Sequence, residues 1–100
     1  MYKLQKTNHF DQWLRKLKDL RAKAKILARL KRIELGNLGD HKSLGGKLSE
    51  LRVDYGPGYR VYFTKTRDRM VILLIGGDKS NQAGDIEKAR NMIKELGVEL

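Results

Sequence analysis

The chain has 100 residues, a length that suits one small domain around one core, and we expect a single domain over residues 1–100. It contains no cysteine, which excludes disulfides and cysteine–zinc sites, and its two histidines are too few for a histidine-rich metal site. No apolar run approaches the roughly 20 residues that cross a bilayer, and no apolar segment of a signal peptide follows the first residues. We therefore expect a cytoplasmic protein that makes no use of a membrane.

The charge balance is strongly positive. Lysine and arginine together number 22 against 12 aspartate and glutamate residues, which gives a formal net charge of +10. The excess positive charges repel one another in the folded state, and together they attract polyanions. It favours nucleic acid as the partner, and the alternatives are an anionic membrane surface, an acidic protein or a merely soluble basic surface.

The first predicted elements are a short strand and a helix. Side chains alternate over residues 2–6, which predicts a strand. Thr7 or Asn8 is placed to cap the helix that follows. Its apolar residues recur at the spacing of one helical face. They are Phe10, Trp13, Leu14 and Leu17.

A second helix is predicted directly after the first. Residues 20–35 contain neither glycine nor proline, Asp19 is placed to cap their start, and Gly36 terminates the helix. Because the connection at residues 18–20 is so short, we expect the two helices to form a hairpin. The apolar stripe of the second helix is Ala22, Ile26, Leu30 and Ile33.

Three strand-like runs follow a loop, residues 37–46, that is rich in glycine, asparagine and aspartate. Apolar and polar side chains alternate over residues 50–55 and again over residues 59–64. Residues 70–75 are continuously apolar, which is typical of a central strand buried on both faces. The two turns between these runs are short enough for antiparallel hairpins.

The chain is predicted to end in a helix. Gly76 and Gly77 close the last strand, and Asp78 or Ser80 can cap the helix, whose apolar face carries Ile86, Ala89, Ile93 and Leu96. The order of elements is then β-α-α-β-β-β-α. It predicts an α+β domain, a mainly antiparallel sheet packed with an N-terminal helical hairpin and a C-terminal helix.

Alternation in the sheet predicts a basic face. If the apolar residues of the runs face the helices, Arg52, Arg60 and Tyr62 share the opposite face, together with Glu50, Asp54 and Thr64. Lys65 and Lys79 are expected close by. Arginine suits phosphate because its planar fork donates to two oxygens, and a tyrosine ring can stack on an unpaired base. The alternative is a solvated face on which these charges form cross-strand ion pairs.

Two further features carry weaker signals. His41 would suit a general base because imidazole exchanges protons near neutral pH, although a single histidine in a loop is more often an ordinary surface residue. Residues 76–80 (GGDKS) follow a strand and open a helix, as phosphate-binding loops do. They lack the spacing of a Walker A motif, so they give little support for nucleotide binding.

Five segments together resemble the RelE/ParE superfamily of toxins, and most closely its HigB-like branch of addiction module killer proteins. They occur in the order of that family and cover nearly the whole chain. They are FDQWLRKLKD (10–19), GNLGDHK (36–42), GGKLSELRVDYGPGYRVYF (45–63), ILLIGGDKSNQ (72–82) and DIEKA (85–89).

The resemblance implies a RelE-like fold and the toxin half of a type II toxin–antitoxin system. It implies a cognate antitoxin as partner, often a small helix-turn-helix protein. It also implies a ribosome-dependent mRNA endoribonuclease (an mRNA interferase) that binds RNA and inhibits translation without a metal or other cofactor. In such enzymes the 2′-hydroxyl of the RNA attacks the adjacent phosphate, and the toxin supplies charge stabilisation and proton transfer.

Carried to this sequence, the resemblance implies catalytic roles for Arg60, Arg52 and Lys79. Fixed cations of this kind stabilise a dianionic transition state more than they stabilise the substrate. Lys79 could also serve as a general base. The RNA- or phosphate-binding residues are expected to be Tyr62, Lys65, Lys47 and Lys42. The candidates for acid or base are His41 and Asp78.

Three positions depart from the family patterns. RelE has a basic residue where this chain has Glu50, residues 81–100 contain no counterpart of RelE's late tyrosine, and only His41 could stand for the pair of histidines in HigB. The acid and the base therefore stay unassigned. Two alternatives follow: a non-catalytic toxin that acts on DNA gyrase, as ParE does, and an inactive toxin fold that serves as partner or co-repressor of its antitoxin.

Overall fold

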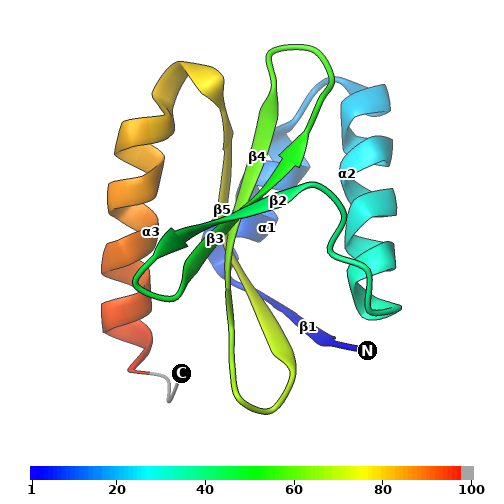
Figure 1. The fold of residues 1–100 in the computed structure, drawn as a ribbon. Helices are drawn as coiled ribbons and strands as arrows, with labels where there is room; N and C mark the ends of the chain where they lie inside the picture. Colours follow the sequence, from blue (N-terminus) through cyan, green and yellow to red (C-terminus); the bar gives the residue numbers. More distant parts are fainter. Residues whose placement is uncertain (98–100) are drawn as a thin grey trace.

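The computed structural model describes residues 1–97 as an α+β fold, in which a five-stranded sheet lies between helices (Figure 1). The strand order is β1-β5-β4-β3-β2. No helix within residues 1–97 is long and apolar enough to cross a membrane. The elements are β1 (Lys3–Lys6), α1 (Asn8–Lys16), α2 (Leu20–Glu34), β2 (His41–Gly45), β3 (Leu48–Val53), β4 (Tyr59–Lys65), β5 (Met70–Asp78), the 3-10 turn η1 (Lys79–Asn81) and α3 (Gln82–Leu96).

The two N-terminal helices begin and end as the sequence predicts. The Thr7 hydroxyl accepts a hydrogen bond from the Phe10 amide, and the Asp19 carboxylate accepts bonds from the first amides of α2. Each cap satisfies donors that an α-helix leaves unpaired at its N-terminus. At the other end of α2, Gly36 takes a φ of 95°, a left-handed conformation that costs glycine little.

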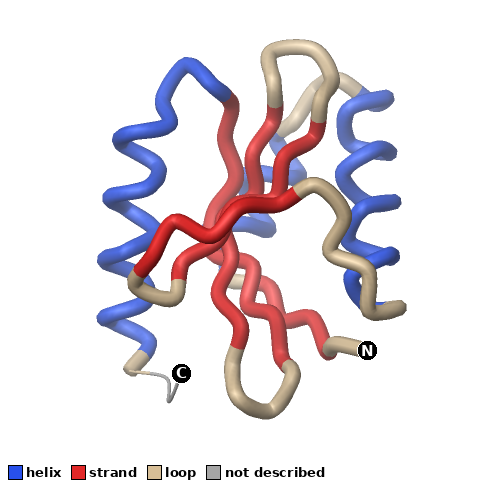
Figure 2. Tube along the Cα trace, viewed as in Figure 1, coloured by secondary structure: helices blue, strands red, loops and turns tan. Residues whose placement is uncertain are grey.

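The sheet is mostly antiparallel, and β5 is a central strand (Figure 2). The only parallel pair in the described part of the chain joins β1 to β5, with Lys3 opposite Met70. The β3–β4 and β4–β5 pairs are antiparallel and are joined by the short turns that the sequence predicts, and β2 pairs antiparallel with β3. The continuous apolar character of β5 is explained by burial on both faces.

Two apolar clusters occupy opposite faces of the sheet. The first lies under α1 and α2 and includes the predicted helix stripes together with Leu51, Val53, Tyr59, Val61 and Phe63. The second lies under α3 and contains Leu48, Tyr62, Ile72, Leu74, Ile75, Ala89 and Met92. The face that carries the arginines is therefore partly covered by a helix.

One strand lies where the sequence predicts a loop. Residues 41–45 form β2, an edge strand that pairs with β3, with His41 opposite Leu51. The expectation of a continuous loop over residues 37–46 is therefore wrong for residues 41–45. The signal is missing because the strand is exposed, so its side chains show no apolar alternation and its stability comes from backbone pairing.

The last strand is longer than expected, because Gly76 and Gly77 continue it to Asp78 instead of closing it. A Cβ at Gly76 would overlap the ring of Trp13, and a Cβ at Gly77 would overlap the carboxylate of Asp85. The glycines thus allow side chains to approach the strand closely from both faces. The GGDKS segment is strand followed by a 3-10 turn, and no phosphate-binding loop is formed.

Candidate functional site

Two arginines face each other in the sheet. Arg52 of β3 is the register partner of Arg60 of β4, so the two side chains leave the sheet side by side. Like charges in directly opposed positions are destabilising unless an anion lies between them. The two arginines line a hollow of about 300 Å³ together with Asp40, Asp54, Gly58 and Lys79. We call this the arginine hollow.

Arg60 is the buried member of the pair. Only 8% of the residue is exposed, and its Nη1 donates to the carbonyl of Tyr59 at 3.2 Å. Its Nε lies 4.0 Å from Oε2 of Glu50, whose side chain is equally buried. That separation gives charge neutralisation but no hydrogen bond. Glu50 therefore keeps a buried guanidinium in the sheet while leaving its donors available.

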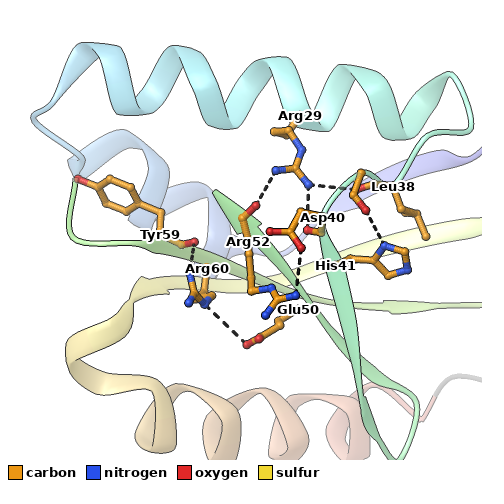
Figure 3. A network of polar contacts seen from close by, with 9 residues as sticks. Arg29, Leu38, Asp40, His41, Glu50, Arg52, Tyr59 and Arg60 are labelled. Atoms are coloured by element: carbon orange, nitrogen blue, oxygen red, sulfur yellow. Dashed lines mark hydrogen bonds and ion pairs between the residues drawn. The ribbon is translucent and has the colours of Figure 1, made fainter. Parts of the chain in front are cut away.

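Arg52 is held through its backbone and its side chain (Figure 3). Its Nη2 lies 3.0 Å from a carboxylate oxygen of Asp40, and its amide donates to the Asp40 carbonyl. Its own carbonyl accepts a hydrogen bond from Arg29 of α2 at 2.5 Å. The Asp40 carboxylate thus occupies part of a guanidinium that would otherwise be open to another anion.

Arg29 fixes the segment that carries Asp40. Its Nη2 donates to the carbonyls of Leu38 and Asp40, in addition to the bond that its Nη1 makes to β3 (Figure 3). Gly39 is needed between them, because its φ is 64° and a Cβ would come within 2.8 Å of the guanidinium. Burial lowers the pKa of Arg29, although Asp40 acts in the opposite direction. One helix side chain thereby ties the loop to the end of β3.

Four buried polar atoms in the described chain lack a hydrogen-bond partner, and all four belong to two adjacent cross-strand pairs. They are Glu50 Oε2, Arg52 Nε, Arg60 Nε and the Tyr62 hydroxyl. Native proteins leave few buried polar atoms unpaired, and a functional role is one reason for such atoms. Their concentration beside the arginine hollow marks this place as the candidate site.

Tyr62 does not lie on an open face as the alternation suggested. It is fully buried in the cluster under α3, so its ring cannot stack on a base. Burial, with the nearby carboxylates of Glu50 and Asp85, raises its pKa to about 12. Gln82 approaches the hydroxyl outside hydrogen-bonding geometry. The expectation that Tyr62 is accessible to RNA failed because the apolar face of α3 packs on this face of the sheet, and Tyr62 lies in the covered part.

Lys79 reaches the arginine hollow from the end of β5. Its methylene groups lie against Gly58 in the turn between β3 and β4, where a Cβ would meet them at 3.1 Å. The φ of Gly58 is 80°, so this turn favours glycine for its backbone as well. The turn thus positions the lysine stem and directs the ammonium group to the hollow.

Two aspartates, one at the end of β5 and one at the start of α3, differ in their electrostatics. Asp78 caps η1 by accepting hydrogen bonds from the hydroxyl and the amide of Ser80, and these bonds lower its pKa. It is therefore a poor proton carrier at neutral pH. Burial raises the pKa of Asp85, with Lys88 opposing the shift. Asp85, which sequence reasoning missed, lies against Gly77, the register partner of Arg60.

A second hollow, of about 290 Å³, lies on strands β2 to β4 and gathers three of the predicted residues, His41, Lys47 and Lys65, with Ser43 and Ser49. His41 faces this second hollow, because it pairs with Leu51 of the cluster under the N-terminal helices. The Gly39 carbonyl accepts a hydrogen bond from Nδ1 of His41 at 2.9 Å. In a neutral ring with this hydrogen bond, Nε2 carries no hydrogen and can act as the proton acceptor.

Apart from Tyr62 and Asp78, the predicted residues divide into two groups. Arg52, Arg60 and Lys79 meet in the arginine hollow, and Lys42, the exposed register partner of Glu50, lies on the same face of the sheet. His41, Lys47 and Lys65 form the second hollow. The neighbouring residues Asp40 and His41 belong to different hollows, so the edge strand β2 separates the two.

The arginine hollow suits an anion with several oxygens. Two guanidinium groups and an ammonium group converge on it, against the two carboxylates of Asp40 and Asp54. The fork of each guanidinium can donate in parallel to phosphate oxygens. Sequence reasoning did not find Asp40 or Arg29, because both act through the loop before β2, whose course depends on the fold.

Residues 12–94 match the model of a family described as phage-derived protein Gp49-like (DUF891). The chain is also similar to a protein of Haemophilus influenzae that is described as uncharacterized, with 56% identity over 89 residues. That match covers 89% of this chain and 90% of the relative. The family match includes every residue of the arginine hollow. The chain therefore belongs to the Gp49-like family, a family of toxin-like addiction module proteins of the RelE and HigB type.

Proposed function

We propose that this protein is the toxin of a type II toxin–antitoxin pair, of the HigB-like branch and with a RelE-like fold, and that it cleaves mRNA on the ribosome at the arginine hollow. The observation that carries the proposal is the facing pair of Arg52 and Arg60, whose Nε atoms are both buried without a hydrogen-bond partner. Two guanidinium groups held side by side suit an anion whose oxygens can accept from both. A cytoplasmic location follows from this target.

The proposed reaction uses the RNA's own nucleophile. The 2′-hydroxyl gives up its proton to solvent as its oxygen attacks the adjacent phosphorus, the bond from phosphorus to the 5′-oxygen breaks, and the 5′-oxygen takes up a proton, which leaves a 2′,3′-cyclic phosphate and a 5′-hydroxyl end. Negative charge accumulates on the phosphoryl oxygens in the transition state, where Arg60 and Arg52 would stabilise it and Lys79 would neutralise or protonate a departing oxygen. No metal or other cofactor takes part in this scheme.

The second hollow would hold the flanking phosphates of the same strand. Lys65, Lys47 and His41 surround it, and β2 is the rim between the two hollows. A single-stranded RNA crossing this rim would meet cations on both sides, and affinity of this kind falls steeply with salt. Arg52 would release Asp40 and bind phosphate in its place.

The experiment is inducible expression of wild type, Arg52→Ala and Arg67→Ala, with the incorporation of labelled methionine and labelled thymidine followed separately. Arg52 is chosen because its side chain is 37% exposed, so its loss should not unfold the protein. Arg67 is an exposed arginine of the turn between β4 and β5 and serves as the matched control for charge.

We expect methionine incorporation to fall first with wild type and Arg67→Ala, and to persist with Arg52→Ala. An earlier fall of thymidine incorporation would replace the proposal by a gyrase-directed toxin. If neither falls, the chain is a toxin fold without toxicity, which would leave a role as partner or co-repressor of an antitoxin.

A further inference from the structure

The turn between β2 and β3 contains a lysine in a left-handed backbone conformation. Lys47 has a φ of 66°, and the two residues before it, Gly45 and Gly46, have φ values of 82° and 59°. Glycine adopts this conformation at little cost, whereas a lysine in it is uncommon and strained. Such strain persists only where the surrounding structure imposes it, and it concentrates at functional sites. Lys47 therefore needs contacts from outside the turn that impose its conformation.

Two side chains from distant parts of the chain hold the turn by its carbonyl groups. Arg90 of α3 donates from Nη1 to the Gly45 carbonyl at 3.0 Å and from Nη2 to the Leu44 carbonyl at 2.8 Å. The hydroxyl of Thr64 on β4, a residue that is 1% exposed, donates to the Lys47 carbonyl at 2.7 Å. Figure 2 shows this turn beside α3. The turn is therefore fixed on both of its sides by groups outside it.

Arg69 is the other non-glycine residue with a positive φ within residues 1–97, at 60°. Its own side chain accounts for this conformation. Its Nε donates to the Met1 carbonyl at 2.9 Å, and its guanidinium lies 4.9 Å from the centre of the Tyr2 ring, so it attaches the N-terminus to the turn between β4 and β5. The backbone of Lys47 is instead held by the side chains of other residues, and this determines where the Lys47 side chain lies.

The Lys47 side chain lines the second hollow, together with Lys65 and three residues of β2 and β3. The two residues that hold the turn belong to the other face of the sheet. Arg90 lies on α3, and Thr64 alternates along β4 with Phe63 of the cluster under α1 and α2. Neither of them lines the second hollow. A cation whose stem starts from a fixed backbone loses less conformational freedom when it binds an anion.

We propose that Thr64 and Arg90 are positioning residues, which hold the β2–β3 turn so that Lys47 is preorganised for a phosphate group of single-stranded RNA in the second hollow. The inference rests on the proposed function for the identity of the ligand, and it adds two residues that do not touch the RNA themselves. The strained backbone is the consequence of this placement. Stability and RNA binding should therefore respond in opposite directions when glycine replaces Lys47.

The first experiment measures binding of the full chain to an oligouridine of about 12 nucleotides, by fluorescence anisotropy over a range of salt concentrations. Lys47→Ala should weaken binding about fivefold at low salt and lower the slope of log affinity against log salt by about 0.7. Thr64→Val should reproduce most of both changes although it removes no charge. Thr64→Ser, which keeps the hydroxyl, should bind as wild type does. Circular dichroism verifies that each variant is folded.

A double-mutant comparison separates positioning from a direct contact or a general loss of structure. Arg90→Ala should weaken binding by itself, whereas Lys94→Ala, which removes one exposed positive charge from the same helix, should not. In the Lys47→Ala background, neither Thr64→Val nor Arg90→Ala should weaken binding further, because the side chain through which they act is already absent.

The second experiment measures stability by urea denaturation. Lys47→Gly removes the strain together with the ammonium group, so it should raise the urea midpoint while it weakens binding. Arg69→Gly is the matched control at the other left-handed residue. It should lower the midpoint, because it removes the contacts with Met1 and Tyr2.

The inference is overturned, with the proposed function intact, if Thr64→Val binds RNA as wild type does or still weakens binding in the Lys47→Ala background. A lowered urea midpoint for Lys47→Gly, or an equal loss of affinity for Lys94→Ala and Arg90→Ala, would overturn it as well. If the variants behave as expected but wild type cleaves no mRNA, the inference stands and the proposed function falls. If wild type does not bind the oligouridine, both fall.

Discussion

Arg52 and Arg60 are direct register partners on β3 and β4, and each is neutralised by a different carboxylate from a different part of the chain. Asp40, from the loop that Arg29 anchors, meets Arg52, and Glu50 meets Arg60 from inside the sheet. The outer pair is partly exposed, whereas the inner pair is buried. This difference decides how each residue should respond to substitution.

Arg60→Ala is expected to destabilise the fold, because it leaves Glu50 as a buried carboxylate without its cation. Removing one partner of a buried pair costs about 3 kcal/mol of unfolding free energy. Urea denaturation of Arg60→Ala, Glu50→Gln and the double variant measures this cost. The double variant should recover much of the loss, and a purely additive result would refute the coupling.

Asp40→Asn is expected to free Arg52 for an incoming anion. Both side chains of this pair are more than a third exposed, so its loss should change the unfolding free energy by less than about 1 kcal/mol. Binding of a single-stranded RNA oligonucleotide, followed by fluorescence anisotropy, should strengthen by a few-fold at low salt. Weaker binding by the variant would mean that Asp40 assists the ligand instead of competing with it.

Gly77→Ala is expected to destabilise the protein, because its Cβ would collide with the Asp85 carboxylate. Overpacking of this kind costs about 1–3 kcal/mol. Combining it with Asp85→Ala removes the colliding atoms and should restore part of the stability in thermal unfolding. If Asp85→Ala gives no relief, the tight site at Gly77 has another cause.

Tyr62 is expected to make the protein sensitive to alkali. Its pKa is raised from 10.0 to about 12, chiefly by burial, so the folded state holds this proton more tightly than the unfolded chain does. The corresponding stability is fully present below pH 10 and is lost as the pH rises through about 12. The unfolding free energy of Tyr62→Phe should fall less over this window than that of wild type. Parallel curves for the two proteins would exclude Tyr62 as the cause.

The helices, the central strands and the arginine pair could be predicted from the sequence because they depend on local periodicity. The spacing of Ile26 and Leu30 predicts a buried helical face, and alternation predicts that Arg52 and Arg60 share a face of the sheet; the structure confirms both. The caps at Thr7 and Asp19 are equally local, since each accepts from amides within three residues.

The remaining features depend on packing between distant segments. The burial of Tyr62 follows from the position of α3, and the strand β2 follows from pairing with β3, which no pattern in its own residues shows. The anchoring of Asp40 by Arg29 joins residues that are eleven positions apart through a loop. The sequence does not predict the strand β2, so alternation along the chain could not show which face of the sheet His41 lies on.

The most direct test of the proposed site is cleavage of a defined mRNA in a reconstituted translation reaction, comparing wild type, Arg52→Ala and the control Arg67→Ala. We predict that wild type and Arg67→Ala produce fragments with a 2′,3′-cyclic phosphate end and that Arg52→Ala lowers the cleavage rate by about a hundredfold. A 2′-deoxy substitution at the cleaved nucleotide should abolish the cut. Undiminished cleavage by folded Arg52→Ala would contradict the assignment of the arginine hollow as the site of reaction.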